Sequence, residues 1–300
     1  MDASDIEFLN NNSLEYLDTI GQGSYGVIYK VYSEQYKEKF AVKRITNDKF
    51  KENEYESMIA IKNTNIVNLY KYVHQGPYVY LMMELCRSNL EEFMNENKDV
   101  PSSKLHEIAL GMINAVNCCH SNGISHGDIK PSNFLFDFNG RIKICDFGLA
   151  QKSLHEQNYT NFSGTMMFLA PEVIRRLPFD AFAADIWSLG VSLYWIFAGS
   201  YPWQYSSKYE LITSILMGKY NEALVNDIFF RQIIKKCLNV NPKERPTVEE
   251  LLHSCNEYLN LGKKKKIFRP FSLSAGSMSM ILKRNMNRPR RCSFSSEKSD

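Results

Sequence analysis

Residues 124–133 read ISHGDIKPSN, and three side chains in this stretch suit the transfer of a phosphoryl group. Asp128 can accept the proton of an attacking hydroxyl, and Lys130 can neutralise charge on the transferred group. Asn133 offers an amide oxygen, which is a ligand type that Mg²⁺ binds. A lone aspartate or asparagine is usually a surface or capping residue, so these assignments depend on the motifs around them.

The sequence DFG follows downstream and begins at Asp146. The run RIKIC before it predicts a strand, which would present Asp146 as a carboxylate ligand for the same cation. Cys145 is the last residue of that run and directly precedes Asp146. A nearby Lys43 and a metal could lower the pKa of its thiol and make it reactive. The reading that we favour is a small buried hydrophobe.

Upstream, Gly21, Gly23 and Gly26 form the pattern GQGSYG. Two unrelated nucleotide-binding folds use this spacing, and a dinucleotide fold needs a helix directly after it. Here the run VIYKVYS follows, and its β-branched and aromatic residues predict a strand. We therefore expect a strand–turn–strand flap whose backbone N–H groups approach phosphates, with a plain glycine hairpin as the alternative.

Lys43 follows in the apolar run AVK. A lysine inside an apolar strand needs an anionic partner, and nucleotide phosphates or a helix carboxylate could provide it. The best carboxylate is Glu54, because helical spacing places it on one face with Met58 and Ile61. The alternative for Lys43 is a surface lysine whose ammonium reaches water.

The two parts of the chain differ in character. Short β-type runs such as KFAVKRIT and YVYLMMEL dominate the first hundred residues, whereas helical periodicity dominates after Arg87. We predict an α+β fold with a small antiparallel β-sheet lobe that carries one helix and a larger, mainly α-helical lobe. The predicted helices of the larger lobe are one within 102–123 with a serine cap, 181–199, 228–239, and one that starts with a capping box of Thr247 and Glu250.

Composition favours an intracellular globular protein, cytoplasmic or nuclear. The chain has 300 residues, is 44% hydrophobic and contains seven scattered cysteines without a CxxC pair, so neither a disulfide framework nor a zinc site is expected. Residues 1–13 form an acidic, polar N-terminal extension that does not resemble a signal peptide. The apolar stretch 186–199 is too short to span a bilayer, so we expect a buried helix and no membrane insertion.

Residues 261–300 form a basic, serine-rich tail. The tail has 11 Lys or Arg and two Asp or Glu, so it carries a charge of +9 while the rest of the chain carries −6. Its composition predicts disorder. Contact with nucleic acid or an anionic membrane is a possible accessory role, but most charge runs are simply solvated.

Together these motifs resemble those of the eukaryotic protein kinase family. The resemblance covers about residues 14–260, with an N-lobe of about 14–86 and a C-lobe of about 87–260, and it includes the later motifs APE, DIWSLG and NPKERPT. It implies that Glu172 of APE pairs with Arg245. It also implies that Asp185 ties the catalytic loop to the large lobe.

Particular residues indicate the subtype that the chain resembles. Lys130 in DIKPSN and Thr165 in SGTMMFLAPE are typical of serine/threonine kinases, and LGVSLYWIFAGSYPW is similar to the calcium/calmodulin-dependent and AMP-activated branch. Most relatives have arginine where this chain has Gly127, so the catalytic loop is of the non-RD (HGD) type. That arginine pairs with a phosphate on the activation segment. We therefore expect that phosphorylation, most readily at Thr160, does not gate activity.

The resemblance also implies a nucleotide pocket for ATP. Ile28 and Ala41 would form its roof and Leu135 its floor. Met83 would be the gatekeeper, before a hinge in which backbone groups of Glu84 and Cys86 meet adenine. The full set of expected nucleotide-binding residues is Ile20, Gly21, Gly23, Gly26, Ile28, Ala41, Lys43, Met83, Glu84, Cys86, Asn89 and Leu135, with Asn133 and Asp146 as the Mg²⁺ ligands.

The function implied is a protein serine/threonine kinase that uses ATP and Mg²⁺, with Asp128, Lys130, Lys43 and Glu54 as the catalytic set. The alternative is a pseudokinase that acts as a scaffold or allosteric partner. The expected partners are protein substrates with serine or threonine acceptors. An upstream basophilic kinase would modify Ser272 and Ser293, which follow arginine in the tail.

Overall fold

The computed structural model describes residues 1–267 except 24–25, 51, 53–54, 56–58, 60, 62 and 153–165, and for 261–267 it describes the backbone alone. The chain divides into two units, Met1–Tyr258 and Leu259–Asp300. In the second unit the described residues are helical, and they belong to α9 (Val248–Ile267).

The first part of the chain forms an antiparallel five-stranded sheet in the order β1-β2-β3-β5-β4. Its strands are β1 (Leu14–Gly23), β2 (Gly26–Ser33), β3 (Glu38–Thr46), β4 (Leu69–Gln75) and β5 (Tyr78–Glu84). β1 and β2 join at the Gly23–Gly26 pair, so the glycine pattern lies in a turn between two strands, as predicted. This excludes the dinucleotide fold, in which a helix would follow the turn.

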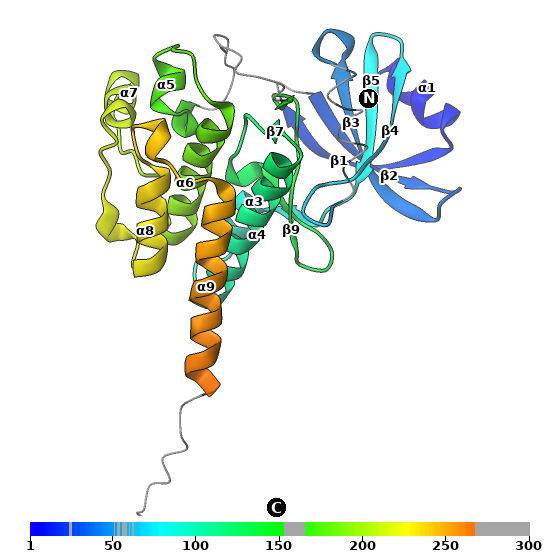
Figure 1. The fold of residues 1–300 in the computed structure, drawn as a ribbon. Helices are drawn as coiled ribbons and strands as arrows, with labels where there is room; N and C mark the ends of the chain where they lie inside the picture. Colours follow the sequence, from blue (N-terminus) through cyan, green and yellow to red (C-terminus); the bar gives the residue numbers. More distant parts are fainter. Residues whose placement is uncertain are drawn as a thin grey trace, which may run out of the picture. The chain divides into compact units, whose positions relative to one another are not determined.

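Two helical segments accompany this sheet. Glu52, Tyr55 and Ile59 are helical, within the segment where one helix was predicted. The second helix, α1 (Ala3–Asn11), was not predicted, and it begins with a capping box between Asp2 and Asp5. Figure 1 shows α1 beside the sheet.

The larger lobe is mainly helical, as predicted, and its long central helix is α6. Its helices are α3 (Leu90–Glu96), α4 (Ser102–Ser121), α5 (Pro171–Ile174), α6 (Ala181–Ala198), α7 (Lys208–Met217) and α8 (Ile228–Cys237), followed by α9. The short strands are β6 (Ser88–Asn89), β7 (Ile124–Ser125), β8 (Phe134–Phe136), β9 (Ile142–Ile144) and β10 (Gln151–Lys152). The short 3₁₀ helices of this lobe are η2 (Pro131–Asn133), η3 (Met166–Phe168), η4 (Glu222–Leu224) and η5 (Pro242–Glu244), and another, η1 (Asn47–Lys49), follows β3 in the sheet lobe.

Helix α6 is the core of this lobe. Trp187, Leu189, Val191, Leu193 and Tyr194 are fully buried in it. Among the described residues, α6 is the one helix long and apolar enough to cross a membrane, but 61% of it is buried within the fold. The core of a soluble protein passes the same test, so the burial supports the predicted buried helix.

The helix ends test two sequence predictions. At the start of α9, Thr247 N donates to Glu250 Oε2 at 2.9 Å and Glu250 N donates to Thr247 Oγ1 at 3.3 Å, which confirms the predicted capping box. The predicted serine cap of α4 is wrong. Pro101 occupies the cap position without a side-chain bond, and the serine at 102 is already the first helical residue. Proline suits the start of a helix because its missing N–H group has no helical partner there.

Candidate active site

A cavity of about 500 Å³ lies where the sheet lobe meets the helical lobe. Its lining includes Lys43 from β3, Met83 and Glu84 from β5, and Asp146 after β9. Gly23 is the last residue of β1 and Gly26 the first of β2, and neither lines the cavity. The predicted pocket residues that the structure brings together in the lining are Ile20, Gly21, Ile28, Ala41, Lys43, Met83, Glu84, Cys86, Asn89, Asn133, Leu135 and Asp146.

The connection between the two lobes contributes Glu84 and Cys86 to the lining of the cavity. Glu84 Oε2 accepts a hydrogen bond from Asn68 Nδ2 at 2.9 Å and lies 3.0 Å from Lys143 Nζ. The Glu84 carboxylate is thus engaged with protein groups, and so is its backbone N–H, which donates to Asn68 O at 2.9 Å. Burial raises the pKa of the Cys86 thiol to about 12, so this residue is a neutral wall of the cavity.

Lys43 has an anionic partner, as its apolar strand requires. Its Nζ lies 2.6 Å from Asp146 Oδ1, and Lys43 is only 8% exposed. Burial would raise the pKa of Asp146, but the charge and the hydrogen bond of Lys43 outweigh burial and hold that pKa below its usual range. Glu54, the predicted partner of Lys43, lies outside the described residues.

Asp128 is the centre of a second polar cluster. Its Oδ2 accepts hydrogen bonds from Lys130 Nζ at 2.6 Å and from Asn133 Nδ2 at 3.1 Å. Asn133 Nδ2 also donates to the backbone oxygen of Asp128 at 2.7 Å. Charge-assisted bonds of this kind hold a carboxylate in one orientation. The three polar residues of ISHGDIKPSN therefore form one connected group.

Asp185 in α6 holds the loop that carries Asp128. Its two carboxylate oxygens accept from His126 N at 2.7 Å and from Gly127 N at 2.9 Å. This is the tie between the loop and the large lobe that the resemblance implied. His126 is fully buried, donates through Nε2 to Cys145 O at 2.9 Å and packs against Phe147. The loop and the DFG segment are thereby joined by one imidazole ring.

Gly127 occupies a backbone conformation that disfavours other residues. Its φ is +78°, and a Cβ built there would lie 2.6 Å from the backbone oxygen of Leu149. Left-handed backbone is costly for residues with a Cβ, and the oxygen is backbone that cannot rotate away. The local backbone therefore favours glycine at position 127 over any residue with a Cβ.

Cys145 is not the fully buried residue that we favoured, because it is half-buried and lines the cavity. The alternative of a reactive thiolate is not supported either. Burial raises the pKa of its thiol, and the neighbouring Asp146 carboxylate adds to the effect, so Lys43 does not make it a thiolate.

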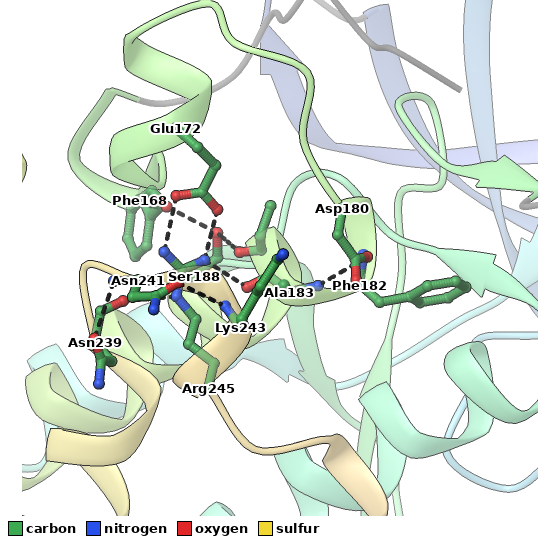
Figure 2. Close-up of polar contacts among 11 residues, drawn as sticks. Phe168, Glu172, Asp180, Phe182, Ala183, Ser188, Asn239, Asn241, Lys243 and Arg245 are labelled. Atoms are coloured by element: carbon green, nitrogen blue, oxygen red, sulfur yellow. Dashed lines mark hydrogen bonds and ion pairs between the residues drawn. The ribbon is translucent and has the colours of Figure 1, made fainter. Parts of the chain in front are cut away.

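Figure 2 shows the pair that the resemblance implied between Glu172 and Arg245. Arg245 Nη1 and Nη2 donate to the two Glu172 oxygens at 2.6 and 2.8 Å, and Nη1 also donates to Ala183 O at 2.9 Å. Nε donates to Asn239 O at 2.8 Å, and the guanidinium lies 5.0 Å from the centre of the Trp187 ring. The segment from Asp146 to Glu172 is thus anchored at its C-terminal end.

Several lining residues were not predicted. Glu92, in the first turn of α3, lines the cavity and accepts from Asn89 N at 3.3 Å, while Asn89 caps the helix through Glu92 N at 2.8 Å. The spacing of an asparagine and a glutamate three residues later is a readable helix-start signal. The apolar residues Val67, Leu69 and Leu81 also line the cavity. The sequence shows that they lie in apolar runs, but the order of the strands in the sheet decides which apolar residues reach the cavity.

The polar groups fit Mg²⁺ bound with a nucleotide. Because Asn133 donates through Nδ2, its Oδ1 is the atom that a cation would bind, and Asp146 offers its second oxygen beside the one that Lys43 contacts. Oxygen ligands suit a hard cation. Within the described ranges there is no group of three His, Cys, Asp or Glu that could hold a metal.

Five other residues named from the sequence lie outside the described residues: Met58, Thr160, Thr165, Ser272 and Ser293.

Comparison with known proteins points to one family. A family model described as "Protein kinase domain" matches residues 14–255. Sperm motility kinase 2B of Mus musculus is 34% identical over 201 residues, covering 67% of this chain and 42% of its own length. Sperm motility kinase 3A of Mus musculus is 32% identical over 241 residues, covering 79% and 48%. NUAK family SNF1-like kinase 1 of Homo sapiens is 28% identical over 262 residues, covering 84% and 39%.

The chain belongs to the protein kinase family. The predicted family and the bilobal α+β fold are confirmed, and the SNF1-like relative agrees with the predicted serine/threonine branch. The chain spans less than half the length of these curated relatives, at 42%, 48% and 39%.

Proposed function

We propose that this chain is an active protein serine/threonine kinase that transfers the γ-phosphoryl group of ATP to serine or threonine hydroxyls of protein substrates. The observation that carries the proposal is the joined arrangement at the cavity. The Lys43–Asp146 pair lines the cavity, and the Asp128–Lys130–Asn133 cluster reaches the cavity through Asn133. His126 joins the catalytic loop to the DFG segment, and Asp185 holds that loop.

Each residue of the set has a chemical task in this proposal. Lys43 positions the nucleotide phosphates, and Asp128 orients the acceptor hydroxyl and accepts its proton. Lys130 lies within hydrogen-bond distance of Asp128 and offsets negative charge that develops on the transferred group. Asn133 and Asp146 would hold Mg²⁺, which neutralises charge on the phosphate oxygens when bound.

The nucleotide itself would occupy the cavity of about 500 Å³. Ile20, Ile28 and Ala41 would cover one face of the adenine and Leu135 the other, with Met83 at the back. Backbone groups at Glu84 and Cys86 would meet its edge, Asn89 the ribose, and Gly21, Gly23 and Gly26 the phosphates. Glu54 would hold Lys43 once nucleotide binds, because Asp146 is then needed by the cation.

The alternative function is a pseudokinase that acts as a scaffold. A pseudokinase normally lacks at least one residue of the catalytic set, whereas Lys43, Glu54, Asp128, Asn133 and Asp146 are all present in this sequence. The contacts among the described members of that set are additional support for activity. A scaffold would not require a lysine–aspartate pair at 2.6 Å within a nucleotide-sized cavity.

The proposal extends to domain limits, location and partners. The kinase domain would span about residues 14–260, with 261–300 as a basic tail whose Ser272 and Ser293 are sites for another kinase. Residues 261–267, which were predicted to be disordered, are helical as the end of α9. An intracellular location is supported by the free thiols of all the cysteines in the described part of the chain.

The proposal is tested by a positional-scanning peptide library with ATP, in the presence and absence of Mg²⁺. We expect Mg²⁺-dependent phosphorylation of peptides with serine or threonine acceptors and none of tyrosine peptides. Binding of nucleotide without transfer to any peptide would favour the scaffold. Transfer to tyrosine alone would contradict the assignment of acceptor class.

A further inference from the structure

Helix α1 lies outside the residues that the family model matches, which begin at 14. It is nonetheless packed on the small-lobe sheet. Phe8 is fully buried and stacks on Tyr80 with ring centroids 4.0 Å apart and an interplanar angle of 5°. Leu9 is buried in the same hydrophobic cluster, which includes Val31 and Val42 of β2 and β3. The helix thus covers one face of the nucleotide-binding sheet.

Asp5 of α1 is a fully buried carboxylate with donors from three neighbouring strands. Its Oδ2 accepts from Tyr29 Oη of β2 at 2.9 Å and from Arg44 Nη1 of β3 at 2.7 Å, and its Oδ1 accepts from Tyr80 Oη of β5 at 2.8 Å. Asp2 N donates to Oδ2 at 2.8 Å. A buried charge is costly unless it is paired and hydrogen-bonded, and here it meets both conditions. One side chain therefore joins β2, β3 and β5.

The charge state of Asp5 agrees with this geometry. Burial would raise the pKa of Asp5, but the hydrogen bonds from Asp2, Tyr80 and Tyr29 and the charge of Arg44 hold it below its usual range. The carboxylate is therefore ionised at neutral pH and forms an ion pair with Arg44.

Arg44 connects this site to the nucleotide pocket. It follows Lys43 in β3, and successive strand residues point to opposite faces of a sheet. Lys43 accordingly lines the cavity while Arg44 reaches α1. The backbone oxygen of Arg44 also lies against Gly26, where a Cβ would come within 1.9 Å of it at a φ of +128°. Arg44 is therefore in contact with Gly26, the first residue of β2, and is the chain neighbour of Lys43. A shift of Arg44 would move both the Lys43 ammonium and Gly26.

We propose that α1 is a built-in clamp on the nucleotide-binding sheet, in which Asp5 is a positioning residue that holds Lys43 and the glycine turn in place through Arg44. The inference rests on the proposed function, because it assigns the clamp's purpose to the nucleotide site. A helix that only stabilised the sheet would affect unfolding and leave nucleotide affinity unchanged. A positioning helix affects both.

The test compares three single substitutions in the full chain. Asp5→Asn keeps the shape of the side chain but removes its negative charge, so the ion pair with Arg44 is lost even where the amide oxygen still accepts from it. Tyr80→Phe removes one hydroxyl donor and keeps both the stack on Phe8 and the Arg44 pair. Glu7→Gln removes a charge from the exposed face of the same helix and serves as the matched control. Calorimetry measures the Kd for Mg·ADP, and urea titration measures the unfolding midpoint.

We expect Asp5→Asn to raise the Kd for Mg·ADP by about fivefold or more, which is the size of effect that coupling through a packed network produces. Tyr80→Phe should lower the unfolding midpoint and leave the Kd within about twofold, because the Arg44 contact remains. Glu7→Gln should change neither. An Asp5→Asn protein that loses stability but binds Mg·ADP as the wild type does would overturn the clamp as a positioning device.

A second variant decides the matter if Asp5→Asn does not fold. Arg44→Met removes the guanidinium, whose Nη1 contacts both Asp2 and Asp5, at 2.6 and 2.7 Å. A raised Kd in Arg44→Met supports the proposal, and an unchanged Kd overturns it. Wild-type protein that binds no Mg·ADP at millimolar concentration would instead overturn the proposed kinase function, and the clamp's purpose with it.

Discussion

The Glu172–Arg245 pair gives a large and specific prediction for stability. Arg245→Met removes a guanidinium that satisfies both Glu172 oxygens and two backbone carbonyls. Glu172 is only 6% exposed, so its carboxylate would remain buried without a partner. Breaking a buried ion pair in this way costs about 3–5 kcal/mol of unfolding free energy. Arg245→Lys should also lose stability, because an ammonium cannot reproduce the two-pronged contact.

A double substitution separates the pair from its surroundings. In Glu172→Gln with Arg245→Met no buried charge is left uncompensated, so the double variant should be more stable than Arg245→Met alone, with a coupling energy of about 0.5–3 kcal/mol. Lys243→Met is the matched control. Lys243 is exposed in the same turn, so removal of its charge should change stability by less than about 0.5 kcal/mol.

The assay is urea denaturation followed by tryptophan fluorescence, with Trp187 reporting directly because the guanidinium lies over its ring. A midpoint that falls at constant slope reports lost stability and not a changed denatured state. The reasoning is refuted if Arg245→Met costs less than about 1 kcal/mol, or if the double variant is less stable than the sum of the two single losses predicts.

The remaining predictions concern Gly127 and Asp146. Gly127→Ala should destabilise the protein by more than the roughly 1–2 kcal/mol that left-handed backbone costs, because its Cβ would meet Leu149 O. Gly123→Ala is the control and should cost only that strain, because Gly123 has a φ of +70° and nothing within 4 Å of a Cβ. Equal melting temperatures for the two variants would contradict this prediction. Phosphatase-treated protein should keep its kcat/KM within about threefold of untreated protein, and a hundredfold loss would show that phosphorylation gates the loop. The pKa of Asp146 is lowered from 3.8, so its pairing with Lys43 should stabilise the fold fully at pH values above 3.8. That stabilisation should be lost as the pH falls through the lowered pKa. The stability difference between wild type and Asp146→Asn should therefore be constant from about pH 5 to 8 and shrink in more acid urea titrations, and a change near pH 7 would contradict the assignment.

The features that were predicted correctly have either a local signal in the sequence or a counterpart in the family that the sequence resembles. The strand–turn–strand around Gly21–Gly26 follows from residue type after the glycines, because β-branched and aromatic residues favour strands. The Thr247–Glu250 capping box follows from a three-residue spacing. The Glu172–Arg245 pair joins residues 73 positions apart, and only the resemblance to a family with fixed motif order predicted it.

The features that were missed depend on distant contacts. Helix α1 has nine residues and only two buried apolar side chains, so its sequence looks like a polar extension. Asp5 is a buried acid whose side-chain donors lie 24, 39 and 75 residues away. Its spacing from Asp2 marks a helix start, but that local signal does not distinguish a buried acid from a solvated one. Lys43 pairs with Asp146 across 103 residues. A pattern can show that Lys43 needs an anion, but the fold decides which carboxylate is nearest.

The central claim, that Asp128 acts in phosphoryl transfer at a working nucleotide site, is tested most directly with Asp128→Asn. Peptide phosphorylation and the Kd for Mg·ATP are measured on the same preparations, with Asp99→Asn, an exposed aspartate before α4, as the control. The account predicts a kcat lower by about 10²–10⁴-fold with Mg·ATP affinity almost unchanged, because the residue acts on the hydroxyl and not on the nucleotide. An Asp128→Asn protein that turns over at the rate of wild type and Asp99→Asn would contradict it.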